Sequence, residues 1–126
     1  LARGPVQRAR LRDGVMTAPI QRRSMVIRVR PEKLQEYRDL HAAVWPEVLE
    51  QIKQCHITNY SIFYRDGLLF GYLEYDGDDW DQDMRRMAAD PATQRWWALT
   101  DPCQEPVKSA APGEHWAPMD EVFHVD

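Results

Sequence analysis

The first regular pattern along the chain is a short run of β-branched residues followed by a longer run with helical spacing. Ser24–Val29 (SMVIRV) alternates in character along its length and predicts a β-strand. Beyond Pro31, which suits the first turn of a helix, apolar residues recur three and four positions apart. Pro46 falls inside this repeat and lacks a backbone donor. We therefore expect a helix over residues 31–54 that is broken into two pieces near Pro46.

Two further runs, Thr58–Arg65 (TNYSIFYR) and Leu68–Tyr75 (LLFGYLEY), are rich in aromatic and β-branched residues. The Asp66-Gly67 pair between them favours a two-residue turn, so the two runs predict a β-hairpin. Neither strand has a plainly polar face, and a sheet that is apolar on both faces needs cover on both. Helices can cover one face, and a second copy of the chain could cover the other.

The rest of the chain predicts a second helical region and one more strand. Asp78 and Asp79 are suited to cap a helix through DWDQDMRRMAAD, and Pro91 interrupts it before a further helical piece, ATQRWWALT. Residues 101–118 are proline-rich and are expected to form a loop, and Glu121–Val125 (EVFHV) is expected to form the last strand. The resulting order is strand, helix, strand, strand, helix, strand. It predicts a ferredoxin-like (split βαβ) α+β fold, in which a four-stranded antiparallel sheet carries helices on one face.

Composition and charge limit the chain to one ordinary globular domain. Its 126 residues are 44% hydrophobic and 29% charged, and no apolar run is long enough to span a membrane. Residues 1–30 contain eight arginines against one acid, Asp13, whereas the remaining chain has 8 basic and 19 acidic residues. Because this basic segment has no interleaved aromatic residues, we expect residues 1–23 to be a disordered leader that binds no nucleic acid. A single domain would then occupy residues 24–126. No signal peptide is recognisable, so a cytoplasmic location without a membrane partner is expected.

Tyr37, His41 and Trp45 are the most informative residues for function. They lie four positions apart and share one face of the predicted helix. An imidazole can exchange protons near neutral pH, and aromatic rings one turn away on each side can hold a flat or ring-shaped ligand. The structural alternative is a buried helix face with one hydrogen-bonded histidine, and the spacing by itself favours that alternative slightly.

Three aromatic residues elsewhere are candidates for the same pocket. Tyr60 lies on the strand after the helix, and its hydroxyl reaches the pocket if its face of the sheet meets that helix. Trp96 and Trp97 point about 100° apart on a helix, so one packs while the other reaches a pocket edge, or both border one cavity. All three are equally compatible with core positions. Structural roles are expected for Glu74, Glu121 and His124. Cys55 and Cys103 are expected to be free thiols without a functional role. His56 is expected to be exposed at the end of the first helix, and His115 lies in the proline-rich loop.

Several classes of chemistry have no motif in this sequence. The His, Cys, Asp and Glu residues form no cluster with metal-ligand spacing, and there is no Gly-rich phosphate loop and no GxSxG nucleophile elbow. The two cysteines form no CxxC pair. We therefore expect no metal and no cofactor. Proton transfer in an aromatic pocket is the chemistry that remains.

Four segments taken together resemble the L-rhamnose mutarotase family over about residues 24–126: YRDLHAAVWPEV, TNYSIFYR, QRWWALTD and the terminal EVFHVD. The resemblance implies a dimeric ferredoxin-like α+β barrel and a cofactor-free isomerase that interconverts the α and β anomers of L-rhamnose. It implies that His41 is the catalytic proton donor and that the sugar is bound by Tyr37, Tyr60, Trp96 and Trp97. It also implies a homodimer, for which the open sheet face is the expected interface. The leader and the long 101–118 segment depart from the family pattern and leave the sugar preference open.

Two other functions fit parts of the pattern. Small dimeric α+β barrels include cofactor-free monooxygenases that act on aromatic substrates, and an aromatic pocket with one histidine would suit them. A non-catalytic sugar-binding or assembly module would instead place the aromatic residues in the core and use the open sheet face as its functional surface. The mutarotase interpretation accounts for all four segments together. In that interpretation Trp45, which precedes Pro46, packs against the helix break and does not touch the sugar.

Overall fold

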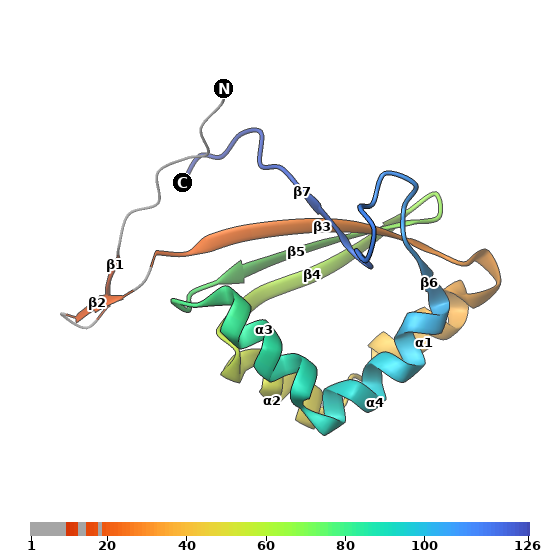
Figure 1. The fold of residues 1–126 in the computed structure, drawn as a ribbon, viewed down its shortest axis with the longest axis horizontal. Coiled ribbons are helices and arrows are strands. Elements are labelled where there is room, and N and C mark those ends of the chain that lie inside the picture. Colours follow the sequence, from red (N-terminus) through yellow and green to blue (C-terminus); the bar gives the residue numbers. More distant parts are fainter. Residues whose placement is uncertain (1–9, 13–14, 18) are drawn as a thin grey trace.

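The computed structural model describes residues 10–12, 15–17 and 19–126, and its main body is a curved sheet with helices on one side (Figure 1). The strand order is β4-β5-β3-β6, and a further strand, β7, pairs with β3 on the edge that β6 also uses. Every pairing is antiparallel. This topology confirms the predicted ferredoxin-like α+β fold with helices on one face. The five strands are β3 (Gln21–Val29), β4 (Ile57–Arg65), β5 (Leu68–Tyr75), β6 (Gln104–Glu105) and β7 (Ala117–Met119).

Proline positions set the boundaries of the first two α-helices. A short 3-10 turn, η1 (Pro31–Lys33), leads into α1 (Leu34–Ala42), and α2 (Pro46–Gln54) follows after a break at residues 43–45. Pro46 occupies the first turn of α2, where its missing N–H costs no helical hydrogen bond. The prediction of a helix over residues 31–54 in two pieces is therefore confirmed.

Aspartate caps define the start of the other two helices. Asp79 caps α3 (Trp80–Ala89) by accepting a hydrogen bond from the backbone N–H of Gln82 (3.1 Å). Asp90 caps α4 (Pro91–Thr100) in the same way, from the N–H of Thr93 (2.9 Å). The predicted interruption at Pro91 is confirmed, because this residue starts α4 and does not continue α3.

The β4–β5 hairpin confirms the turn that the sequence predicts. Asp66 and Gly67 have φ angles of 51° and 81°, and a type I′ turn requires positive φ at both of its central residues. Along β5, every second residue is buried. The helices lie on one side of this hairpin (Figure 1). The opposite face of the same hairpin has no helix over it, and Phe63 there is 63% exposed.

The buried core is divided into two clusters. One contains Ile27, Val29, Tyr37, Leu69 and Cys103, and the other contains Cys55, Ile57, Leu73, Tyr75 and Met87. A polar group, here called the Asp83 cluster, adjoins the second of these. In it the buried Asp83 carboxylate accepts hydrogen bonds from Tyr75, His56 and Arg86. This cluster fixes the start of α3 to the end of β5.

The last part of the chain differs from the prediction. Residues 101–118 are not a simple loop, because they contain the 3-10 turn η2 (Asp101–Cys103), β6 and the start of β7. The predicted strand Glu121–Val125 is wrong, since residues 120–126 have no helix or strand. A strand forms only where a neighbouring edge supplies backbone partners. On β3 that edge pairs with β6 and β7, and the pairing ends at Met119.

The predicted disordered leader, residues 1–23, lies partly outside the described residues. Within the described part, β1 (Arg10–Arg12) pairs with β2 (Val15–Thr17), and the first core strand begins at Gln21, three residues earlier than predicted. No helix in the described part of the chain has both the length and the apolar character needed to cross a membrane.

Candidate active site

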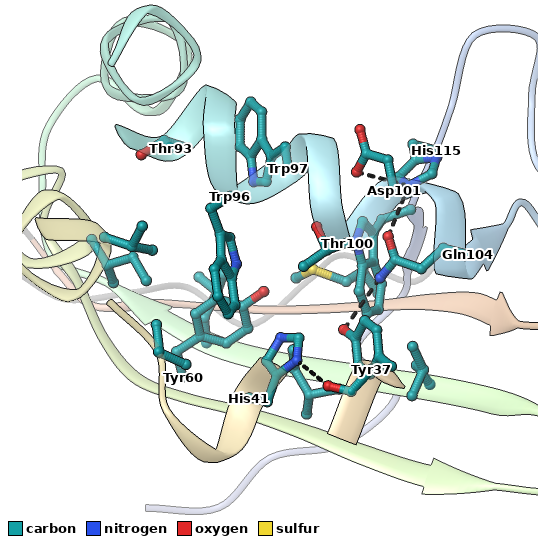
Figure 2. A pocket seen from close by; sticks show the side chains of 18 of the residues that line it. Tyr37, His41, Tyr60, Thr93, Trp96, Trp97, Thr100, Asp101, Gln104 and His115 are labelled. Carbon is teal, nitrogen blue, oxygen red and sulfur yellow. Dashed lines mark hydrogen bonds and ion pairs between the residues drawn. The ribbon is translucent and has the colours of Figure 1, made fainter. Parts of the chain in front are cut away.

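A cavity of about 1160 Å³ lies between the sheet and the helices. Most of its wall is made of apolar and aromatic side chains, with a few polar groups among them, which is typical of small-molecule sites. All five predicted site residues line it, although they come from α1, β4 and α4. Figure 2 labels the main groups on the wall: Tyr37, His41, Tyr60, Thr93, Trp96, Trp97, Thr100, Asp101, Gln104 and His115.

His41 is held by a hydrogen bond within its own helix. Its Nδ1 lies 2.8 Å from the backbone carbonyl oxygen of Tyr37, four residues earlier on α1. A carbonyl oxygen can only accept, so Nδ1 carries a proton and donates it. The second ring nitrogen, Nε2, has no protein hydrogen-bond partner among the described residues. It can accept a proton when the ring is neutral and donate one when the ring is charged.

Tyr37 lies directly beside this imidazole. The two ring centroids are 4.2 Å apart, and Tyr37 is 5% exposed. Its hydroxyl oxygen accepts a hydrogen bond from the side-chain amide of Gln104 (3.2 Å). Burial raises the pKa of Tyr37, so its hydroxyl is neutral at physiological pH. The helical spacing of four residues thus places a neutral hydroxyl next to the imidazole.

Tyr60 reaches the cavity because of an irregularity in β4. The pairing of β4 with β5 shifts between Thr58 and Ser61, and Asn59 there has a φ of 46°. This β-bulge allows Ile57 and Tyr60 both to line the cavity, although regular alternation would place them on opposite faces. The Tyr60 residue is 39% exposed overall, but desolvation of its hydroxyl on the cavity wall raises the pKa of this group, so it too is neutral.

The tryptophan pair borders the cavity from α4. Trp96 is 6% exposed and meets the His41 ring edge to face, with centroids 5.3 Å apart. Its other neighbour is Trp45, also at 5.3 Å and also edge to face. Trp97 is half-buried and lines the same cavity, so both tryptophans border one space. Trp45 is absent from the wall of this cavity, in agreement with its predicted role at the helix break.

Three polar residues on the wall were not predicted as site residues. Gln104, Asp101 and His115 lie at the end of the cavity next to the Tyr37 hydroxyl (Figure 2). The Gln104 side-chain oxygen is 2.9 Å from Nε2 of His115, and that nitrogen is 3.5 Å from an Asp101 carboxylate oxygen. Asp101 and Gln104 follow the tryptophan pair closely in the sequence, which is the one local signal that pointed to them.

The remaining candidates lie away from the cavity: Glu74, Glu121 and His124, for which structural roles are predicted, and His56, Cys55 and Cys103. Glu74 accepts hydrogen bonds from Asn59 and Tyr72, and His56 belongs to the Asp83 cluster. Glu121 pairs with Arg22 (2.7 Å), and His124 contacts the terminal Asp126. Cys55 and Cys103 are buried free thiols. Within residues 10–12, 15–17 and 19–126, no three His, Cys, Asp or Glu side chains are grouped as a metal site.

Comparison with known proteins identifies the family. The family model described as L-rhamnose mutarotase matches residues 22–125. An L-rhamnose mutarotase from Oceanobacillus iheyensis is 31% identical over 85% of this chain and its own full length. Another, from Sinorhizobium fredii, is 35% identical over 79% of this chain and 92% of its own length.

Two solved structures share the fold. One is the crystal structure of an L-rhamnose mutarotase from Formosa agariphila, with a TM-score of 0.67, 22% identity and coverage of 84% of this chain and 99% of that one. The other is tetracenomycin F2 cyclase from Streptomyces glaucescens, with a TM-score of 0.63, 16% identity and the same coverage. At these identities the two structures support the fold alone. The match of the family model to nearly the whole described body, together with relatives above 30% identity, establishes that the chain belongs to the L-rhamnose mutarotase family.

Proposed function

We propose that this chain interconverts the α and β anomers of L-rhamnose in the cavity between the sheet and the helices. The observation that carries the proposal is the His41 imidazole. Its Nδ1 donates to the Tyr37 carbonyl, and its Nε2, on the wall of an aromatic cavity, has no hydrogen-bond partner among the residues that the structure describes. Membership of the L-rhamnose mutarotase family supports the reaction and the sugar.

The reaction requires two proton movements. The ring oxygen of the sugar gains a proton while the anomeric hydroxyl loses one, and the ring then opens to an aldehyde. The bond between C1 and C2 rotates, and the ring closes on the other face of the carbonyl. In our proposal protonated His41 supplies the proton to the ring oxygen through Nε2. The Nδ1–H bond to the Tyr37 carbonyl holds the ring in place and stabilises its charged form.

A water molecule is the acceptor that we propose for the anomeric proton. Tyr37 and Tyr60 both have raised pKa values, which makes their anionic forms rare at neutral pH and makes them poor bases. Their neutral hydroxyls are suited to donate hydrogen bonds to the sugar. Small-molecule pockets typically have volumes of about 300–1,000 Å³, so the present cavity of about 1160 Å³ has room for water beside a monosaccharide.

The tryptophan pair would bind the apolar parts of the sugar. Trp96 and Trp97 both line the cavity, and Trp96 stands edge to face against His41. An indole face packs well against the C–H groups of a pyranose ring and against its C6 methyl group. Packing of this kind would hold the ring oxygen close to Nε2 of His41.

Anomer exchange of L-rhamnose, followed by saturation-transfer NMR, tests the proposed function. We expect wild-type protein to accelerate exchange and His41→Asn to lose about 10²–10⁴-fold of that acceleration, the usual contribution of a general acid. Asparagine is the most selective substitution, because its amide can still donate a hydrogen bond to the Tyr37 carbonyl while no group replaces Nε2. Wild-type exchange in His41→Asn would remove His41 from the mechanism. Oxygen uptake with a polyphenol, without any anomer exchange, would favour a monooxygenase instead.

We also propose that the protein is a homodimer that associates through the open face of the sheet. Phe63 is 63% exposed there, and Phe70 opposite it on β5 is half-buried. The C-terminal segment adds exposed apolar residues, of which Val122 is 96% exposed and Phe123 80%. Sedimentation velocity should give a dimer for the wild type and a monomer for Phe63→Arg, whereas a monomeric wild type would refute the interface. A cytoplasmic location stays a prediction.

A further inference from the structure

A chain of hydrogen bonds runs along the cavity wall away from His41. It begins at the Tyr37 hydroxyl, passes through the side-chain amide of Gln104 and reaches the His115 ring, which also contacts Asp101 (Figure 2). All four residues line the cavity. Gln104 is 6% exposed and Tyr37 is 5% exposed, so little water competes for the contact between them. The outer end of the chain is more open, since the side chains of His115 and Asp101 are 40% and 55% exposed.

The chemistry of the partners fixes the direction of every bond in this chain. Nε2 of His115 faces two oxygens, one from the Gln104 amide (2.9 Å) and one from the Asp101 carboxylate (3.5 Å). Both oxygens only accept, so Nε2 carries a proton. With its oxygen turned to His115, Gln104 presents its NH₂ group to Tyr37 (3.2 Å). An NH₂ group only donates, so the Tyr37 hydroxyl oxygen accepts.

The hydroxyl proton of Tyr37 is therefore left for another acceptor. No protein acceptor for it occurs among the described residues, and the hydroxyl lies on the cavity wall. The rings of Tyr37 and His41 lie side by side, with centroids 4.2 Å apart, so the hydroxyl and the proposed acid belong to the same part of the cavity wall. If the Gln104 amide turned over, its oxygen would face Tyr37 and take the proton instead.

We propose that His115, oriented by Asp101, is a positioning residue that fixes the Gln104 amide so that Tyr37 donates its hydroxyl proton to the bound sugar. The inference rests on the proposed function for the identity of the ligand. It gives residues of the 101–118 segment a role in binding the sugar. His115 does not touch the reacting atoms in this arrangement. It acts through Gln104 on Tyr37.

Two substitutions at His115 distinguish the effect of its hydrogen-bond donor from the effect of its size. His115→Leu removes the Nε2–H donor, so the Gln104 amide is free to turn over. The Tyr37 hydroxyl then donates its proton to the Gln104 oxygen and not to the sugar. We expect the acceleration of L-rhamnose anomer exchange, measured as kcat/KM, to fall about fivefold, as for the loss of one neutral hydrogen bond. His115→Gln places an amide NH₂ at the same reach as Nε2 and should recover most of that loss. Wild-type kcat/KM in His115→Leu would overturn the proposal.

A double-mutant cycle tests whether the effect passes through Tyr37. In a Tyr37→Phe background there is no hydroxyl proton to direct, so adding His115→Leu should cause no further loss. An equal fold-loss from His115→Leu in both backgrounds would overturn the proposal, because His115 would then act by another route. A general structural role of His115 would produce this equal loss in both backgrounds.

A measurement independent of activity completes the test. Long-range ¹H–¹⁵N correlation spectra of wild-type protein report which ring nitrogen of a neutral histidine carries the proton. We expect His115 to carry it on Nε2. A proton on Nδ1 would overturn the positioning role while leaving the proposed function intact. Conversely, a protein with the Nε2–H form that does not accelerate anomer exchange would refute the proposed function together with the role assigned to the sugar.

Discussion

This molecule contains two pairs of neighbouring tyrosine and histidine side chains that differ in their surroundings. In the Asp83 cluster, Tyr75 and His56 both donate to the same carboxylate, and the Tyr75 hydroxyl also accepts from the backbone N–H of Asp79. The Tyr75 hydroxyl there both donates to and accepts from protein groups. At the cavity, the side chains of His41 and Tyr37 each have one hydrogen-bond partner in the described part of the protein and one position left for a ligand.

The comparison shows that residue type alone does not identify a site. Tyr75 is fully buried and lies away from the cavity, whereas the His41 ring borders a space of about 1160 Å³. A buried cluster whose polar groups bond to one another stabilises the fold, and a cluster with available donors and acceptors beside a cavity can bind and react. Substitutions in the Asp83 cluster should therefore lower stability and leave activity unchanged, whereas substitutions at the cavity should lower activity.

The largest stability effect is expected at the Asp83 cluster. Asp83→Ala leaves the buried Tyr75 hydroxyl without its acceptor and should lower the free energy of unfolding by about 2–3 kcal/mol. Urea unfolding followed by circular dichroism measures this change. Activity per folded molecule should stay at the wild-type level, because the cluster does not line the cavity. A stable but inactive Asp83→Ala protein would break the distinction between the two clusters.

The Asp83 cluster should also govern part of the acid sensitivity. Burial alone raises the pKa of Asp83, but hydrogen bonds from Tyr75 and His56, with the charge of Arg86, outweigh it and leave this pKa below its ordinary value. A lowered folded pKa contributes stability above the unfolded value of about 3.9, and the contribution is lost as pH falls through the folded pKa.

Comparison with Asp83→Asn isolates this effect. The asparagine variant cannot titrate, so its stability deficit relative to the wild type should shrink as pH falls below about 4. Urea unfolding at a series of pH values gives the two curves. A deficit that stays constant down to about pH 2 would mean that the Asp83 carboxylate is not held in its charged form by its neighbours.

Much of the fold and half of the site follow from local sequence. The spacing of Tyr37 and His41 predicted that they share a helix face, and their rings do lie side by side. Asp66-Gly67 predicted the hairpin because its turn depends on only two residues. Such features depend on neighbours in the chain, and simple periodicity detects them.

Other features depend on contacts between distant segments and were missed. Gln104 meets Tyr37 because β6 pairs with β3, which brings together residues 67 positions apart. The bulge at Asn59, which sets the direction of Tyr60, has no glycine to signal its positive φ. The EVFHV segment has the alternation of a strand but pairs with no strand of the described residues. In each case the deciding interaction is absent from the local sequence.

A smaller effect is expected from the second cavity tyrosine. Tyr60→Phe removes a neutral hydroxyl donor from the cavity wall and should lower kcat/KM for L-rhamnose about fivefold. Stability should change little, because no protein hydrogen bond of this hydroxyl occurs in the described part of the chain. The matched control is Tyr64→Phe, a second tyrosine of β4 on the cavity wall, whose ring lies near Arg38. Equal losses in the two variants would show that the effect is not specific to Tyr60.

The smallest effect is expected at Trp45, which packs on Trp96 and does not line the cavity. Trp45→Phe should keep the aromatic contact and reduce the free energy of unfolding by about 1 kcal/mol. The affinity for L-rhamnose, measured by titration calorimetry, should be unchanged. A large loss of affinity at wild-type stability would place Trp45 in the binding site and would require a different boundary for the cavity.

The most direct test of the central claim compares matched substitutions in the two clusters. His41→Asn and His56→Asn each keep an amide that can replace Nδ1 as a donor, to the Tyr37 carbonyl or to Asp83. Asparagine also tolerates the φ of 65° at position 56. Saturation-transfer NMR of L-rhamnose at equal folded protein should show exchange lost in His41→Asn and retained in His56→Asn. Retained exchange in His41→Asn, or its loss in His56→Asn, would contradict the assignment of the proton chemistry to the cavity.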